Sequence, residues 1–334
     1  MILVTGGTGL VGAHLLLHLV EQGENVRAMY RTTLSIEKTK NLFSLYHKSD
    51  LFEKIEWIEG DILDIPSLEI VFQDIESVYH CAAMISFDPK DEDAIRKTNI
   101  EGTANIVTFC LAYNIKKMLF VSSIAALGDP TSAETTISET TEWNPEKPHS
   151  DYAISKYGAE MEVWRGQQEG LQVVIVNPGI ILGPGFWNQG SGTLFDTIKK
   201  GISFYTNGST GYVAVTDVVK IMHLLLQSDC SGERFTLVAE NISYKEIIIK
   251  IANKINAQLP KIEAKPWLLN LIWKADWLSA IVFRTKRKIS KHGVLSLQNN
   301  DLISNEKLKT YLNYDFEEID AYLNQIVLYY HSKI

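Results

Sequence analysis

The chain has 334 residues, of which 46% are hydrophobic and 22% are charged, and its formal net charge is −8. This composition indicates a globular protein with one large domain or two modest ones. The acidic balance argues against a nucleic-acid partner, because phosphate backbones are bound by basic surfaces. The three cysteines are widely spaced and offer neither a disulfide framework nor metal-ligand spacing. We therefore expect a reducing, cytoplasmic location, no metal site and no secretion signal.

Short apolar segments alternate with helical patterns over the first two-thirds of the chain. This alternation predicts an α/β fold, a Rossmann-type doubly wound parallel sheet with helices on both faces. Each predicted strand is rich in apolar or β-branched residues, as expected for strands that are buried on both sides. The predicted strands are 2–5, 25–30, 55–59, 77–80, 117–122 and 172–177, and the predicted helices are 9–22, 34–46, 66–75, 94–113 and 152–169.

The sequence changes character after Pro178. Residues 179–192 contain five glycines and a proline and are predicted to form a loop. A short strand and a helix at 213–227 are predicted to return to the main sheet, and further helices are predicted at 243–256 and 316–331. We therefore expect two units. They are a dinucleotide-binding domain of 1–178 plus about 213–240, and a smaller C-terminal substrate-binding lobe of 179–212 and 241–334.

A glycine-rich segment lies between the first predicted strand and the first predicted helix. Glycines there permit a tight turn, a close approach of the backbone to a pyrophosphate, and close packing of the helix on the strand. The start of the helix adds free N–H groups and a partial positive charge, so the segment predicts a dinucleotide site. Its residues are Thr5, Gly6, Gly7, Thr8, Gly9, Leu10, Val11 and Gly12.

The spacing of this segment, Thr-Gly-x-x-Gly-x-x-Gly, resembles the loop of the extended short-chain dehydrogenase/reductases, the superfamily of NAD-dependent epimerases and dehydratases. The resemblance extends along nearly the whole chain. Residues 26–31, Val-Arg-Ala-Met-Tyr-Arg, are similar to the dihydroflavonol-4-reductase-like branch, which uses NADPH. The resemblance implies an NAD(P)-dependent oxidoreductase.

The end of the second predicted strand discriminates between the two nicotinamide cofactors. An acidic residue there binds the ribose 2′-hydroxyl of NAD, whereas a basic residue accepts the 2′-phosphate of NADP. Residues 25–33 hold no carboxylate, Arg31 stands at this position, and Lys38 can add a second charge. NADP(H) is therefore the preferred cofactor. NAD(H) is the alternative, if Arg31 is only a solvated residue at the strand end.

Further cofactor contacts follow from the resemblance, at the ends of the later strands. It implies an acidic residue on the adenine amino group, small residues beneath the pyrophosphate and ribose, and an Asn-Pro pair after the sixth strand. His80, which lies among them, is interpreted as structural rather than catalytic. The implied contacts are Asp61, Ile62, Ala82, Ala83, Asn177 and Pro178.

Tyr152 and Lys156 are four residues apart on a predicted helix, so both project from one face. A lysine ammonium lowers the pKa of a nearby tyrosine phenol from its usual value of about 10, which makes the phenol an effective acid or base. The pair matches the Tyr-x-x-x-Lys motif of the superfamily, in which the lysine also holds the nicotinamide ribose. The resemblance places Ser123, with Ser122 as the alternative, on the substrate oxygen, and gives Asn99 a supporting role.

The substrate side is expected to be apolar or aromatic. Four aromatic residues of the second unit, Phe186, Trp187, Phe195 and Phe204, are predicted with Ser123 to contact the substrate. We therefore expect an NADP(H)-dependent reductase of a ketone or aldehyde, with hydride moving from nicotinamide to the carbonyl carbon.

Several alternatives remain open. One is an NAD-dependent nucleotide-sugar epimerase or dehydratase, or a 3-beta-hydroxysteroid-type dehydrogenase. Another is a redox-sensing binding protein, which the Tyr152/Lys156 pair argues against. The segment 267–288 has three interpretations, a core helix, part of the substrate pocket or a membrane-surface helix. A homodimer through the helices of Asn99 and Tyr152 is expected by analogy.

Overall fold

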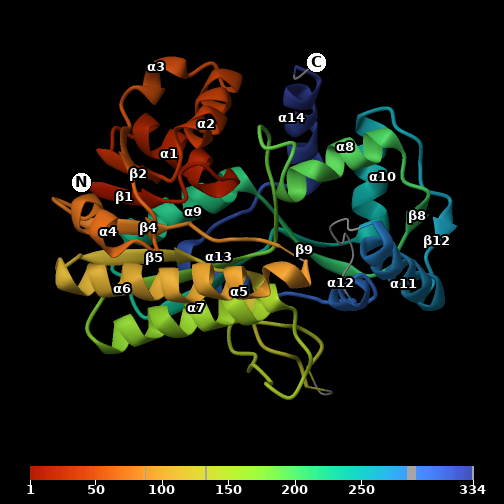
Figure 1. Cartoon of the computed structure of the whole chain (residues 1–334). Coiled ribbons are helices and arrows are strands. Elements are labelled where there is room, and N and C mark those ends of the chain that lie inside the picture. Colours follow the sequence, from red (N-terminus) through yellow and green to blue (C-terminus); the bar gives the residue numbers. More distant parts are fainter. Residues whose placement is uncertain (87, 132–133, 284–290, 333–334) are drawn as a thin grey trace.

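The computed structural model describes residues 1–86, 88–131, 134–283 and 291–332 (Figure 1). Its central feature is a parallel sheet of seven strands in the order β10-β6-β5-β4-β1-β2-β3. The order reverses between β1 and β4, and doubly wound sheets bind their ligands at such a point. All six predicted strands are confirmed. The strands are β1 Ile2–Thr5, β2 Val26–Tyr30, β3 Glu56–Glu59, β4 Ser77–His80, β5 Lys117–Val121, β6 Val173–Pro178 and β10 Glu233–Leu237.

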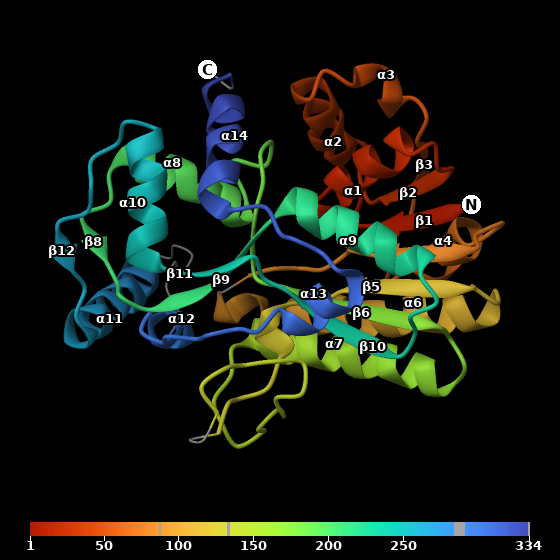
Figure 2. The same cartoon turned by 180° about the vertical axis from the view of Figure 1, so that it is seen from behind.

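Helices cover both faces of this sheet, as Figures 1 and 2 show from opposite sides. One face carries α1 Leu10–Glu21, α2 Thr33–Leu45, α3 Ser49–Phe52 and α9 Val215–Gln227. The other face carries α4 Ile65–Val71, α5 Glu92–Arg96, α6 Gly102–Ala112 and α7 Asp151–Gln168. The predicted doubly wound architecture is therefore confirmed.

Strand β5 illustrates why these sequences form buried parallel strands. All five of its residues are buried. Leu119 and Val121 pack into the core beneath α1 and α9, whereas Met118 and Phe120 pack into the core beneath α6 and α7. Because successive side chains of a strand point to opposite faces, a strand between two helical layers is apolar throughout.

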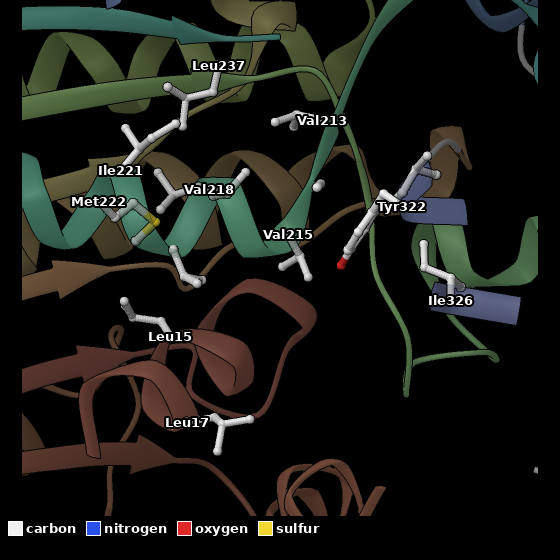
Figure 3. Packing of buried hydrophobic residues seen from close by; sticks show 14 of the residues in the cluster. Leu15, Leu17, Val213, Val215, Val218, Ile221, Met222, Leu237, Tyr322 and Ile326 are labelled. Carbon is white, nitrogen blue, oxygen red and sulfur yellow. The ribbon is translucent and has the colours of Figure 1, made fainter. Parts of the chain in front are cut away.

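The core on the α1 and α9 face extends to the C-terminal helix α14 Ile319–His331. Figure 3 shows Leu15 of α1, Val218 and Met222 of α9, and Tyr322 and Ile326 of α14 gathered in this cluster. These side chains are almost completely buried. Burying a side chain of this size contributes roughly 1.5–3 kcal/mol. The last helix therefore helps to stabilise the main sheet domain.

A second group of elements lies to one side of the sheet (Figures 1 and 2). It contains a three-stranded sheet of order β11-β9-β7 and a two-stranded sheet of β12 and β8. The strands are β7 Ile180–Leu182, β8 Phe204–Tyr205, β9 Ser209–Ala214, β11 Glu240–Ser243 and β12 Ile262–Glu263. The helices of this group are α8 Thr193–Lys200, α10 Tyr244–Lys254, α11 Pro266–Phe283 and α12 Lys291–Ser296, whereas α13 Glu306–Leu312 packs against β10 of the main sheet.

Two sequence expectations after residue 178 are corrected. The segment 179–192 contains the strand β7, and the strand near 213 is β9, which pairs with β7 and β11 rather than with the main sheet. The chain returns to the main sheet through α9 and then β10, which pairs with β6. An apolar run predicts a strand, but it does not say which sheet the strand will join.

The apolar stretch 267–283 falls within α11, whereas its basic continuation 284–288 lies outside the described residues. Among the helices of the described residues, none combines the length and the apolar character needed to cross a membrane.

Candidate active site

The glycine segment connects β1 to α1 at the carboxyl edge of the sheet and packs against the end of β4. Gly6 has a φ of 70°, and a Cβ on it would lie 2.6 Å from the backbone nitrogen of Ala82. A Cβ on Gly12 would lie 2.2 Å from the carbonyl oxygen of Gly6. Both positions therefore require glycine, because the turn is in the left-handed region at Gly6 and the backbone is crowded at both.

The start of α1 is open on its outer side. Gly9 is the N-cap residue, and no side chain caps the helix. A Cβ built on Gly9 would meet only the Gly6 carbonyl oxygen, at 3.5 Å, which is an ordinary contact. Thr8, Leu10 and Val11 around it are half-buried. Uncapped N–H groups at a helix N-terminus suit a phosphate, so the segment fits the pyrophosphate of a dinucleotide.

His80, at the end of β4, holds the neighbouring backbone in place. Its Nδ1 is 2.7 Å from Thr5 Oγ1 and its Nε2 is 3.0 Å from Thr103 Oγ1. Thr5 Oγ1 also accepts a hydrogen bond from the backbone N–H of Ala82 at 3.3 Å. Burial lowers the pKa of His80 to about 3. A neutral histidine with both nitrogens bonded is a structural connection between strand ends, and it leaves half-buried Ala82 and exposed Ala83 beside the glycine segment.

The end of β2 presents cations to solvent. Arg31 is exposed directly after the strand, and α2 begins at Thr33. The N-cap residue Thr32 makes no side-chain cap, and the first turn of α2 contains no acidic residue. Lys38, also exposed, donates to Gln189 Oε1 at 3.3 Å. The segment after β2 therefore combines exposed cations with a helix N-terminus that no side chain caps.

Asp61 and Ile62, after β3, differ in their surroundings. Asp61 Oδ1 accepts from the backbone N–H of Leu63 at 2.9 Å. Ile62 is 4% exposed, its side chain fits where Gly102 has no Cβ, and its carbonyl oxygen accepts from Asn105 at 2.9 Å. Ile62 is therefore a packing residue between β3 and α6, and its side chain is not available to a ligand.

Tyr152, Ser123 and Lys156 come together where β5 ends and α7 begins. Ser150 caps α7 by accepting from the Ala153 N–H at 3.1 Å, which fixes the start of the helix. The Ser123 hydroxyl and the Tyr152 phenol are hydrogen-bonded. Lys156, one turn further along α7, donates to the carbonyl oxygen of Val121 at 2.7 Å. Because β1 and β5 are parallel, this cluster lies at the same sheet edge as the glycine segment.

Burial dominates the protonation of this pair. It raises the pKa of the Tyr152 phenol, and the hydrogen bond with Ser123 opposes that rise. Burial also lowers the pKa of Lys156 to about 8, while the charge of Glu160 opposes the fall. Our expectation that Lys156 would lower the pKa of Tyr152 is therefore corrected for the cofactor-free chain. The ammonium is engaged with the Val121 carbonyl and lies 4.5 Å above the Phe120 ring.

Asn99 connects the loop after β4 to α7. It lies in a π-helical turn, Lys97–Glu101, between α5 and α6. Its Oδ1 accepts from the Met84 N–H at 2.7 Å, and its Nδ2 donates to the Met84 carbonyl at 3.0 Å and to Ser155 Oγ at 2.9 Å. π-Helical turns interrupt α-helices mainly at functional sites. The geometry gives Asn99 a backbone-holding position beside Tyr152.

Ser122 and Asn177 face away from Tyr152, toward a buried carboxylate. Ser122 Oγ donates to Glu160, and Asn177 Nδ2 donates to Glu160 at 2.6 Å and to the Ser123 carbonyl at 2.9 Å. Ser123, rather than Ser122, is therefore the serine beside the phenol. The side chain of Asn177 supports Ser123 from behind, and Pro178 pairs with β10. Glu160 was missed in the sequence. The available signal was a carboxylate four residues after Lys156 on the buried side of the helix.

The aromatic residues predicted to contact substrate do not line one pocket. Phe186, Trp187 and Phe195 are 4%, 7% and 1% exposed, and each packs into a hydrophobic core. Trp187 and Phe195 both contact the ring of Tyr330 on α14. Phe204 is 39% exposed on β8, which Figure 1 shows at the outer edge of the smaller group of elements. The first three are core residues, and we do not assign them to a substrate pocket.

These features agree with comparisons to known proteins. The chain belongs to the NAD dependent epimerase/dehydratase family, whose model matches residues 2–237. It is an NAD(P)-dependent oxidoreductase of the extended short-chain dehydrogenase/reductase type.

Individual relatives include both reductases and epimerases. A Synechocystis sp. protein named "Putative dihydroflavonol 4-reductase" is 31% identical over 291 residues, covering 84% of this chain and 80% of that protein. A UDP-glucose 4-epimerase of Vibrio cholerae is 26% identical over 296 residues, covering 85% and 84%. The crystal structure of gox2253 has a TM-score of 0.83 at 24% identity and covers 100% of this chain and 98% of that one. The last similarity concerns the fold alone.

Proposed function

We propose that this protein is an NADP(H)-dependent reductase that converts a ketone or aldehyde of a small apolar or aromatic molecule to the alcohol. The observation that carries the proposal is the hydrogen-bonded pair of Ser123 and Tyr152 with Lys156 one turn away, at the sheet edge that also holds the glycine segment. The similarity to a protein named as a reductase supports this direction of reaction.

The residues of the site suit proton donation to a carbonyl oxygen. When bound, the reduced nicotinamide supplies the hydride. The raised pKa of Tyr152 keeps its phenol protonated at neutral pH, which is the form that reduction requires. Tyr152 donates this proton as the carbonyl oxygen becomes an alkoxide, and Ser123 donates a hydrogen bond to the same oxygen. Lys156 would bind the ribose hydroxyls of the cofactor and would stabilise the phenolate that remains.

The cofactor site is proposed along the same sheet edge. The segment from Thr5 to Gly12 would hold the pyrophosphate, and Arg31 with Lys38 would hold the 2′-phosphate of NADP. Exposure of Arg31 and the uncapped, acid-free start of α2 support the phosphate assignment. The remaining proposed contacts are the Asp61 side chain, the backbone of Ile62, and the residues Ala82, Ala83, Tyr152, Lys156, Asn177 and Pro178.

A substrate would meet apolar surface beside Tyr152. Asn99 fixes the backbone of Met84, and the next residue, Ile85, is 60% exposed. We propose that this loop, rather than the buried aromatic residues, forms one wall of the substrate site. The division into a dinucleotide-binding domain and a substrate lobe of 179–212 and 241–334 remains a proposal. We change this division in one respect, because the side chains of α14 pack in the main core.

The test is a cofactor titration followed by a carbonyl panel. We expect NADPH to bind at least ten times more tightly than NADH by intrinsic fluorescence, and NADPH oxidation at 340 nm to require an added aromatic or aliphatic ketone or aldehyde. Tighter binding of NADH, or the absence of turnover with every carbonyl of a broad panel, would overturn the proposal.

A nucleotide-sugar epimerase or dehydratase, or a 3-beta-hydroxysteroid-type dehydrogenase, is the second candidate. The similarity to a UDP-glucose 4-epimerase over 85% of the chain favours the epimerase. An epimerase regenerates its nicotinamide within each cycle and retains it, whereas a reductase exchanges it. Purified protein that carries one equivalent of NAD would therefore support the epimerase. We also propose a homodimer and a cytoplasmic location, which light scattering and cell fractionation test.

A further inference from the structure

A fully buried carboxylate lies behind the catalytic side chains. Glu160 is 0% exposed and receives three donors. They are the Ser122 hydroxyl, Asn177 Nδ2 at 2.6 Å and a guanidinium nitrogen of Arg234 at 3.1 Å. A buried carboxylate is costly unless it is paired and hydrogen-bonded, and these three donors offset part of that cost.

Two of these contacts lead directly to the reacting groups. The second N–H of the Asn177 amide donates to the carbonyl oxygen of Ser123 at 2.9 Å. Ser122 follows Val121, whose carbonyl oxygen accepts from Lys156. The carboxylate thus fixes the backbone that carries Ser123 on one side and borders the lysine on the other.

The third contact leads to the loop that precedes Tyr152. Arg234, on β10, donates through Nε at 2.9 Å and a terminal nitrogen at 2.6 Å to the carbonyl oxygen of Glu139. The Glu139 side chain accepts from the Thr236 N–H at 2.7 Å. Arg234 is therefore shared between α7 and the backbone at Glu139, and it joins both to the edge strand of the sheet.

The charge of Glu160 also faces Lys156, which lies one helical turn earlier on α7. All three partners of Glu160 are donors, so the contacts satisfy its ionised form. Burial raises the pKa of Glu160, and Ser122, Arg234 and Asn177 oppose this rise. Charge interactions with Glu160 and, to a smaller extent, with Cys81 raise the pKa of Lys156 against the effect of burial. A charged Glu160 therefore opposes the fall in the pKa of Lys156 that burial causes.

We propose that Glu160 is a positioning residue of the reaction, which holds Ser122, Asn177 and Arg234 behind the Ser123–Tyr152 pair and supplies the negative charge opposite Lys156. This inference rests on the proposed reductase function for its catalytic meaning. The electrostatic part is testable in the cofactor-free chain, so that failure of one is distinguishable from failure of the other.

The test is the titration of Lys156 itself. Lysine labelled with ¹³C at Cε is incorporated into the whole chain, and the Lys156 resonance is assigned by its loss in Lys156→Met. The wild-type resonance is expected to titrate near pH 8. In Glu160→Gln it is expected to titrate about one pH unit lower, because loss of a nearby negative charge favours the neutral amine. Glu162→Gln, the same change in a surface ion pair of α7, is expected to leave it unmoved.

A folded Glu160→Gln protein in which Lys156 titrates as in the wild type would overturn the proposal. If Glu160→Gln does not fold, the double variant Glu160→Met/Arg234→Met replaces the buried ion pair with apolar side chains, which proteins often tolerate. Lys156 is expected to titrate lower there as well, and an unchanged titration would again overturn the proposal. With an identified substrate, Glu160→Gln is also expected to move the alkaline limb of kcat/KM to lower pH, which a purely structural role would not do.

Discussion

The seven-stranded sheet and the C-terminal group of elements differ in how their sequences relate to their sites. Around the sheet, the candidate site residues lie at the carboxyl ends of parallel strands or on the helices and turns beside those ends, so their places follow from the order of strands. In the C-terminal group, strands of two to six residues alternate with the helices α8 and α10 and with irregular segments. Three of the aromatic residues predicted to contact substrate, Phe186, Trp187 and Phe195, are instead buried in the core. Strand topology therefore predicts where the proposed cofactor and proton-transfer site lies, whereas the substrate pocket depends on packing that periodicity does not encode.

The largest effect is expected at Tyr152, on the helix α7 that covers the sheet. Tyr152→Phe removes the proton donor while keeping the ring, so kcat for an identified carbonyl is expected to fall by about 10²–10⁴-fold. NADPH affinity measured by fluorescence should stay near the wild-type value. Tyr113→Phe, which removes an exposed hydroxyl on the same face of the sheet, is the control and should retain full turnover. Comparable loss in both variants would contradict the assignment.

The aromatic residues of the second region are expected to act through stability. Phe195→Ala removes a side chain that is 1% exposed and should lower the free energy of unfolding by about 3–5 kcal/mol. Phe204→Ala, at a site that is 39% exposed, should change it by less than about 1 kcal/mol. Denaturant titrations followed by circular dichroism measure both. A substrate-specific rise in KM for Phe195→Ala without loss of stability would restore that residue to the substrate pocket.

Two glycines of the same segment separate folding from cofactor binding. Gly12→Ala forces a Cβ against the Gly6 carbonyl oxygen and is expected to cost about 1–3 kcal/mol of stability. Gly9→Ala makes only an ordinary contact within the chain, so its Tm should be unchanged. Its methyl group would still crowd a pyrophosphate, and the Kd for NADPH is expected to rise about tenfold. Wild-type affinity in Gly9→Ala would show that the dinucleotide does not approach this turn.

The last expected effect, similar in size to those of the glycine changes, concerns the choice of cofactor. Arg31→Ala removes a charge-assisted hydrogen bond to a 2′-phosphate, which is worth about 1.5–3 kcal/mol, so the Kd for NADPH should rise roughly 10- to 100-fold. The Kd for NADH should change by less than about twofold. Lys54→Ala removes an exposed cation between α3 and β3 and serves as a control for net charge. Equal weakening of both cofactors by Arg31→Ala would argue against NADP selectivity.

The sequence predicted the sheet well because most of its first six strands are rich in apolar or β-branched residues and are bounded by turn residues. The positions of Ser123, Tyr152, Lys156 and Asn99 followed from one resemblance, and the structure brings these side chains to one sheet edge. Glu160 was not predicted, because its significance arises only when β6 and β10 bring Asn177 and Arg234 to it. Residues from four segments meet there, and no local spacing announces such a contact.

The strand β10 was missed for a related reason. Its sequence, Glu-Arg-Phe-Thr-Leu, begins with two charged residues and resembles the edge of a loop. Arg234 is nevertheless half-buried, since Glu160 and the Glu139 carbonyl accept its donors. Partner groups from distant segments thus override the polar appearance of a short strand.

The π-helical turn Lys97–Glu101 has a consequence for how this helix tolerates change. One extra residue in a turn advances everything after it by about 100° around the helix axis. The turn therefore changes which side of the helix the following residues face. Asn99 faces Met84 and Ser155, while Gly102 faces Ile62. Deleting one residue there would restore regular α-helical hydrogen bonding. Only one of the two sets of contacts, that of Asn99 or that of Gly102, would then stay in place. Because of this fixed rotation, one helix can place Asn99 at the candidate site and Gly102 against the core.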